Sequence, residues 1–279
     1  MFCLCGLKEG IVIIMETKKL FISADIEGSC GISHWEETNL TDAYFRTEMT
    51  KEVASACEGA KIAGFDTIII KDAHDTARNL YPDKLPRYAF LLRNWTRDPW
   101  CMVSGLDETF DAAAFTGYHS PAFSSGSPLA HTMSTSLQFI KINGEYISEF
   151  VINAYACAYK GVPVAFVAGD EYLCEQAVKY IPSITTAPVN KGMGGASFST
   201  HPEEAQNLIK ERIAKALTGD YKKCLAALPA CFEVEIQYKK QESAYQRQFF
   251  PGAKLVNPYT VGFISDDYYS VLVFLHFCM

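Results

Sequence analysis

The stretch LFISADIEGSCG, residues 20–31, begins as a buried strand and ends on two carboxylates, Asp25 and Glu27, which are followed by Gly28. Capping a following helix would need only one of these carboxylates, so a second one indicates a different purpose. In open α/β sheets, ligands bind beyond the carboxyl ends of the strands. The stretch therefore predicts an α/β fold with a polar site at the end of this strand.

The rest of the chain alternates apolar runs with segments of helical period, which is typical of a largely parallel sheet flanked by helices. Further strands are predicted over residues 66–71, 112–117, 163–168 and 184–189, and helices over 42–64, 148–162, 170–181 and 201–217. After Gly219 the pattern changes to strands with one wet face, at 231–238 and 259–265. This change predicts a smaller α+β portion at the C-terminal end.

Three segments follow from these patterns. Residues 1–14 are predicted to be a non-native leader or a disordered tail, because Lys-Glu-Gly at 8–10 can be encoded by a ribosome-binding sequence and Met15 follows closely. Residues 15–195 are predicted to form the α/β domain that carries the site, and residues 196–279 the smaller α+β portion. The boundary lies in NKGMGGASFST, residues 190–200, whose glycines and serines are typical of a linker or an active-site loop.

Composition excludes some classes of partner. The 279 residues carry a formal net charge of −7, so no basic surface is expected for nucleic acid or for an anionic membrane. Apart from the close pair Cys3 and Cys5 near the N-terminus, the cysteines are scattered singly through apolar segments, which is typical of reduced thiols. No apolar run reaches the roughly 18 residues of a membrane span. We therefore predict a cytoplasmic location.

Polar side chains close three of the predicted strands. The first strand ends on Asp25 and Glu27, the second on Asp72 and His74, and the third on Tyr118 and His119. Because the carboxyl ends of parallel strands meet at one edge of a sheet, these groups are expected to converge. A mixed set of Asp, Glu and His favours zinc, with manganese or cobalt as alternatives. Asp170, which ends a fourth strand, is interpreted as the cap of the following helix.

Two segments outside the strand ends complete the set. His131 follows a loop rich in Ser, Gly and Pro (124–128), where a mobile catalytic group can approach a site. Glu149 stands near the start of a helix, with Asn153 one turn later on the same face. Taken alone, Glu149 also fits a carboxylate stabilised by the helix dipole.

Together these segments resemble the M55 family of metallopeptidases, the D-aminopeptidases. The resemblance runs from about Lys19 to the C-terminus and is carried by SADIEGSCGI, KDAHDTARNL, GLDETFDAAAFTGYHS, AHTMS, GEYISEFVINAY and GVPVAFVAGD, in that order. The segments ISHWEET (32–38) and RYAFLLRNWTRDPW (87–100) match weakly and are expected to line the substrate entrance. The family's α/β fold, with a smaller second portion, agrees with the pattern described above.

The resemblance implies a site with two zinc ions per subunit, in which Asp25 bridges the ions. Glu27 and His74 complete one ion's protein ligands, and His119 and Glu149 complete the other's. It implies that His131 is the catalytic histidine, and it gives Asp170 no role. It further implies that N-terminal D-residues such as D-alanine are released from short peptides, and that subunits assemble as a homo-oligomer, a ring decamer being known in the family.

Two such ions hold a water between them, lower its pKa and clamp the oxygens of the tetrahedral intermediate. His131 is expected to stabilise the oxyanion or to pass a proton to the leaving amine. Asp72 and Asn153 are candidates for orienting the histidines and the substrate.

Three alternative functions follow from the same residues. The chain fits an L-aminopeptidase, a two-metal phosphoesterase that uses a cation such as Arg78, or a non-enzymatic binding or assembly protein with a closed metal shell. The apolar last segment, DDYYSVLVFLHFCM (266–279), is expected to be either a subunit contact or a core helix.

Overall fold

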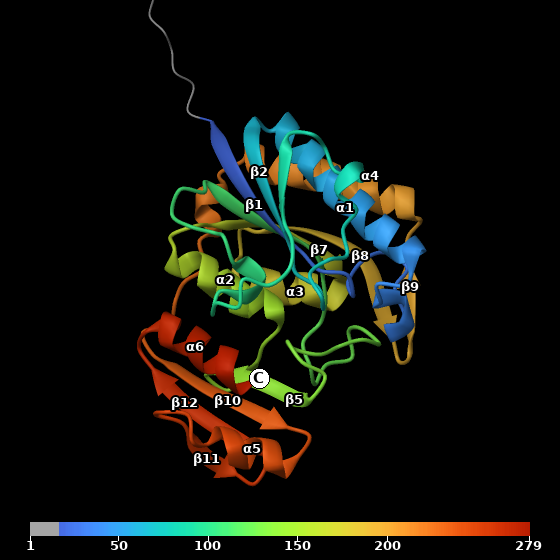
Figure 1. Cartoon of the computed structure of the whole chain (residues 1–279). Coiled ribbons are helices and arrows are strands. Elements are labelled where there is room, and N and C mark those ends of the chain that lie inside the picture. Colours follow the sequence, from blue (N-terminus) through green and yellow to red (C-terminus); the bar gives the residue numbers. More distant parts are fainter. Residues whose placement is uncertain (1–16) are drawn as a thin grey trace, which may run out of the picture.

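The structure is a computed structural model that describes residues 17–279, so the prediction for residues 1–14 lies outside the described part. Its main feature is a seven-stranded sheet with the order β3-β2-β1-β4-β7-β8-β9, parallel except for the final β8–β9 pair (Figure 1). Its strands are β1 (Lys18–Ala24), β2 (Phe65–Asp72), β3 (Ala89–Leu92), β4 (Ala112–Tyr118), β7 (Val164–Asp170), β8 (Thr185–Met193) and β9 (Ala196–Ser199). The predicted α/β fold with a largely parallel sheet is confirmed.

Helices cover both faces of this sheet. α1 (Ala43–Ile62) and α4 (Pro202–Thr218) pack together on one face, while α2 (Glu149–Tyr159) and α3 (Glu171–Tyr180) lie on the other. The sequence of β1 is apolar because its residues are buried on both faces. Leu20 and Ile22 join the core under α1 and α4, and Phe21 joins the core under α2. A strand that is covered on both faces has no wet side to alternate with.

A second, antiparallel sheet has the order β11-β12-β10-β5-β6. It consists of β5 (Leu137–Ile142), β6 (Glu145–Tyr146), β10 (Phe232–Tyr238), β11 (Lys254–Asn257) and β12 (Thr260–Ser265), with α5 (Gln241–Arg247) and α6 (Tyr268–Cys278) beside it. Helix α6 also contacts α2, where the Tyr268 hydroxyl donates to the Ile152 carbonyl at 2.8 Å. The two sheets therefore share one continuous core.

The predicted boundary near residue 195 does not match this arrangement. β9 and α4 follow that point and yet belong to the large sheet and its covering layer, whereas β5 and β6 precede it and pair within the small sheet. The small portion is thus not one contiguous C-terminal segment, because the chain enters it once between β4 and α2. The segment 190–200 is neither a linker nor a loop but the β8–β9 hairpin, with Gly194 at φ +60° in its turn.

The apolar last segment forms α6. Its Val271, Phe274 and Leu275 are buried, so the core-helix interpretation holds for that face.

Four short 3-10 helices complete the described elements: η1 (Trp35–Thr38), η2 (Pro82–Lys84), η3 (Cys101–Val103) and η4 (Tyr221–Cys224). Within residues 17–279, none of the helices combines the length and the apolar character that crossing a membrane requires.

Candidate metal centre

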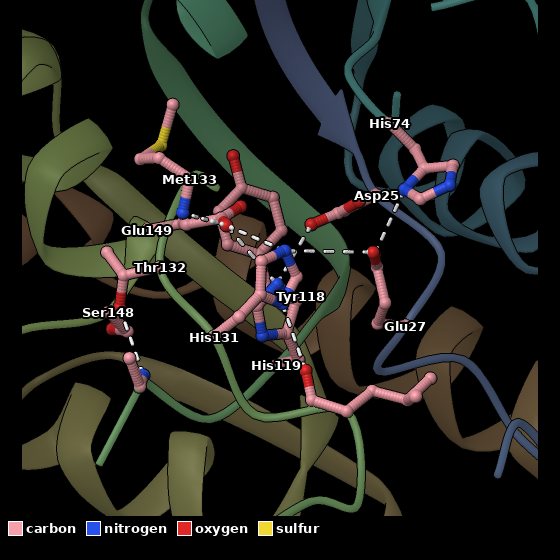
Figure 2. Close-up of polar contacts among 12 residues, drawn as sticks. Asp25, Glu27, His74, Tyr118, His119, His131, Thr132, Met133, Ser148 and Glu149 are labelled. Atoms are coloured by element: carbon pink, nitrogen blue, oxygen red, sulfur yellow. Dashed lines mark hydrogen bonds and ion pairs between the residues drawn. The ribbon is translucent and has the colours of Figure 1, made fainter. Parts of the chain in front are cut away.

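The loop after β1 turns both of its carboxylates toward one side. Gly28 makes this turn possible, because it donates its N–H to the Gly117 carbonyl at 2.8 Å and passes directly against β4. A Cβ at Gly28 would lie 1.7 Å from the Tyr118 carbonyl oxygen, so only glycine fits there. Asp25 and Glu27 are thereby brought to the same edge as the residues that follow β2 and β4 (Figure 2).

The first group of ligand atoms joins β1 to the loop after β2. His74 Nδ1 lies 3.2 Å from Asp25 Oδ1 and 3.1 Å from Glu27 Oε2, and all three side chains are buried. The other ring nitrogen, Nε2, donates to the Thr38 carbonyl at 3.1 Å. This bond fixes the tautomer and leaves the Nδ1 lone pair facing the carboxylates.

The second group joins β1 to β4 and to the start of α2. His119 Nε2 lies 3.6 Å from Asp25 Oδ2 and 3.4 Å from Glu149 Oε1. Its Nδ1 donates to the Ser120 carbonyl at 3.0 Å, and Glu149 Oε1 accepts the Met133 N–H at 2.7 Å. The two oxygens of Asp25 therefore face different groups, and Asp25 is common to both (Figure 2).

These distances fit zinc. Ligand atoms about 2.0–2.2 Å from a tetrahedral ion lie about 3.3–3.6 Å from one another. The four separations between a histidine nitrogen and a carboxylate oxygen in the two groups, 3.1–3.6 Å, are close to that range. Two of the facing atoms, Glu27 Oε2 and His119 Nε2, are buried without a hydrogen-bond partner among the described residues. Buried polar atoms normally have partners, so their lone pairs are available to a metal ion.

The electrostatics also call for added positive charge. Burial, reinforced by Glu27, raises the pKa of Asp25 well above its ordinary value. Burial opposes a charged imidazole, yet the neighbouring carboxylates outweigh it and raise the pKa of both His74 and His119. Three carboxylates packed together in a buried site are thus stabilised by cations, and divalent ions supply that charge most directly.

His131 lies at the opening of this cluster. Its Nδ1 donates to the Leu129 carbonyl at 2.9 Å, while Nε2 lies 3.6 Å from Glu149 Oε1 and 3.9 Å from Glu27 Oε1. The His131 ring stacks on His119 with centroids 4.3 Å apart, and it makes an edge contact with Trp35, with centroids 5.1 Å apart. With Glu27 and His119 it also forms a third group of ligand-type atoms, so position alone does not separate a ligand from an acid–base group.

The loop that carries His131 is anchored rather than free. Thr132 Oγ1 donates to the Ile147 carbonyl at 2.9 Å and accepts the Ala122 N–H at 3.1 Å. Phe123 stacks on Tyr146 of β6 with centroids 4.7 Å apart. A composition rich in Ser, Gly and Pro therefore marks a tightly turned segment here, held by contacts that are distant in sequence.

The structure brings all the candidate site residues together: Asp25, Glu27, His74, His119, His131 and Glu149. The orienting residues give a mixed outcome. Asp72 does bind the turn that contains His74, through Asn79. The Asn153 amide instead donates to Tyr118 Oη and Met102 Sδ, both at 3.2 Å, and not to a ligand. Asp170 caps α3 as predicted, but it also binds Ser120, beside His119.

A cavity of about 600 Å³ opens onto the cluster. As predicted, both weakly matched segments line it, with Trp35 and Glu36 from the first and Trp95 from the second. Sequence reasoning missed Asp75 and Cys101, which also line it. Neither carries a local signal, because both reach the cavity through left-handed backbone turns, at φ +43° and +49°.

Comparison with known proteins places this arrangement in a family. A family model described as D-aminopeptidase matches residues 18–277. The chain belongs to the M55 family of peptidases. A D-aminopeptidase of Bacillus subtilis (strain 168) is 30% identical to this M55 chain over 272 residues, which cover 94% of this chain and 98% of that protein.

A solved structure of a D-aminopeptidase has the same fold. It is the zinc-dependent D-aminopeptidase DppA from Bacillus subtilis, described as a self-compartmentalizing protease. The two structures match with a TM-score of 0.87 at 28% sequence identity, covering 93% of this chain and 96% of the other. The resemblance to the M55 family drawn from sequence segments is confirmed, as is the fold that it implied.

Proposed function

We propose that this M55 chain is a zinc-dependent aminopeptidase that releases N-terminal D-residues, small ones such as D-alanine most readily, from short peptides. The observation that carries the proposal is the pair of buried ligand groups that share Asp25 and open onto one cavity. The names of the family and of both relatives, one of them zinc-dependent, support the activity and the metal.

The five ligand side chains divide between two ions. Asp25 bridges them, since each of its oxygens faces one group. Glu27 and His74 hold one ion, and His119 and Glu149 hold the other. When bound, zinc ions held by these residues would supply Lewis acidity and lower the pKa of a bound water. Asp25 would set the spacing of the two groups, because it follows directly after β1, which lies between β2 and β4 in the sheet.

His131 is proposed as the catalytic histidine. The bond from its Nδ1 to the Leu129 carbonyl leaves the Nε2 lone pair directed toward the cavity. From there Nε2 can accept a proton and pass it to the leaving amine. Stacking on His119 and the edge contact from Trp35 hold the ring in this orientation.

Two of the alternative functions lose support. A phosphoesterase would place cations beside the metals, but the cavity-lining residues in the described part include no Lys or Arg, and Arg78 is exposed elsewhere. A purely structural metal site would be closed, whereas this cluster faces a cavity large enough for a short peptide. The L-aminopeptidase alternative is left to experiment.

Assembly into a homo-oligomer, such as the ring decamer that the family resemblance implies, belongs to the same proposal. The relative described as self-compartmentalizing supports it. The small portion also exposes large apolar side chains, at Tyr245, Phe249, Ile264 and Phe277. Such patches are typical of subunit contacts. Sedimentation of the purified protein is expected to show a stable multimer, and a stable monomer with full activity would contradict it.

The activity itself is tested with matched stereoisomers. Zinc-loaded protein is offered alaninamide and alanyl p-nitroanilide, each in the D and the L configuration. We expect kcat/KM for each D-isomer to exceed that for its L-isomer by about 10²-fold or more, a difference of about 3 kcal/mol in transition-state binding. A preference for the L-isomers would favour the L-aminopeptidase, and hydrolysis confined to bis(p-nitrophenyl) phosphate would favour the phosphoesterase.

A further inference from the structure

Two buried carboxylates outside the ligand set end strands next to β1 and β4. Asp72 ends β2, next to β1, and Asp170 ends β7, next to β4; their exposures are 0% and 1%. We propose that each is a positioning residue for a different ion, Asp72 for the His74 side and Asp170 for the His119 side. The inference rests on the proposed two-ion site. It assigns to Asp170 a role in positioning His119, in addition to its role as the N-cap of α3.

Asp72 organises the turn that presents His74. Its Oδ2 accepts the N–H groups of Asn79 and Leu80 at 2.6 and 2.8 Å, and its Oδ1 accepts Asn79 Nδ2 at 2.9 Å. The same Asn79 amide donates a second bond, at 2.7 Å, to the His74 carbonyl. Asp72 therefore fixes the His74 backbone through Asn79, while the Thr38 carbonyl fixes the ring.

Asp170 does more than a helix cap requires. The cap is the bond from the Leu173 N–H to Oδ1, at 2.8 Å. Two further bonds come from Ser120, whose N–H donates to Oδ2 at 2.6 Å and whose hydroxyl donates to Oδ1 at 2.5 Å. Ser120 in turn offers its carbonyl to His119 Nδ1 at 3.0 Å. Asp170 thus fixes the residue that sets the tautomer and direction of His119, leaving Nε2 for the ion.

The two networks are independent of each other. One contains Asn79 and Leu80 and acts on His74, the other contains Ser120 and Leu173 and acts on His119, and they share no residue. Partners that orient a ligand typically contribute 10–100-fold to metal affinity. Each carboxylate should therefore tune one ion and leave the other unchanged, which a merely structural role would not do.

The test isolates one ion at a time. His74→Ala leaves intact only the ligand group of His119, and His119→Ala leaves intact only the ligand group of His74. Asp72→Asn or Asp170→Asn is added to each background. Asparagine keeps the shape of the side chain, but its NH₂ group replaces one oxygen and cannot accept the backbone N–H bonds that the carboxylate accepts. Zinc affinity is then measured by competition with a chromogenic chelator.

In the His74→Ala background we expect Asp170→Asn to weaken zinc binding 10–100-fold and Asp72→Asn to change it less than about threefold. The His119→Ala background should show the reverse. Equal losses in both backgrounds, or no loss in either, would overturn the inference. Failure of the wild-type chain to bind zinc at all would instead overturn the proposed function.

Controls separate positioning from folding. Asp267→Asn removes an equivalent cap from α6, where Oδ2 accepts the Ser270 N–H at 2.9 Å, and should leave zinc binding unchanged in both backgrounds. If Asp170→Asn or Asp72→Asn fails to fold, the milder Ser120→Ala and Asn79→Ala keep both carboxylates and the α3 cap. Each should give a smaller loss, still confined to its own side, and a loss on the opposite side would overturn the assignment.

Discussion

Replacing Asp25 with alanine is expected to release both zinc ions and to abolish turnover in one step. Asp25 is the only side chain common to both ligand groups, with Oδ1 facing His74 and Oδ2 facing His119. Without it each ion keeps two protein ligands, fewer than the three of a usual catalytic zinc site. We expect kcat/KM to fall by more than about 10³-fold, which corresponds to about 4 kcal/mol of barrier.

Elemental analysis of the purified variant, together with D-alaninamide hydrolysis, measures this result. Glu27→Ala is the matched control, because Glu27 pairs with His74 and, in the proposed division, serves one ion only. It should lose one ion and keep the other. Retention of one tightly bound ion by the Asp25→Ala protein would show that the carboxylate is not a bridge.

Replacing His131 with alanine is expected to lower kcat while both ions stay bound. Loss of a positioned acid–base group typically costs about 10²–10⁴ in rate, or about 3–5 kcal/mol. His131 Nε2 lies 3.6 Å from Glu149 and 3.9 Å from Glu27, at the upper end of the separations within the ligand groups or beyond them. The two ligand groups are complete without it.

Parallel measurements of zinc content and of kcat decide between the roles that the geometry allows. A lower zinc content in His131→Ala would make the residue a ligand, and near-normal turnover would make it a bystander. His201→Ala is the matched control. His201 is the exposed N-cap of α4 and belongs to none of the ligand groups among the described residues, so its replacement should change neither quantity.

The large sheet was predictable because its information is local. Apolar runs of strand length alternate with helical segments, and in a parallel sheet every strand must deliver its C-terminal residue to one edge. The strand pattern alone therefore predicts that Asp25, His74 and His119 meet. The division of ligands between the ions came from the family resemblance; the structure is compatible with it, and the variants described above test it.

The small sheet was only partly predictable, for a physical reason. Its central pairing joins β10 to β5, with Val234 opposite Ile142, and nothing local in either segment indicates a partner about ninety residues away. The second role of Asp170 was hidden similarly, because an aspartate before a helix looks the same whether it caps one N–H or also binds a distant serine.

The most direct test of the central claim is a zinc titration of chelator-stripped wild-type protein while D-alaninamide hydrolysis is followed, with L-alaninamide in parallel. The two ligand groups around Asp25 predict that activity rises until about two ions are bound per chain. Membership of the M55 family predicts that only the D-isomer is hydrolysed at an appreciable rate. Saturation at one ion, or full activity in the stripped protein, would contradict the two-ion site, and release of ammonia from the L-isomer at an equal rate would contradict the proposed specificity.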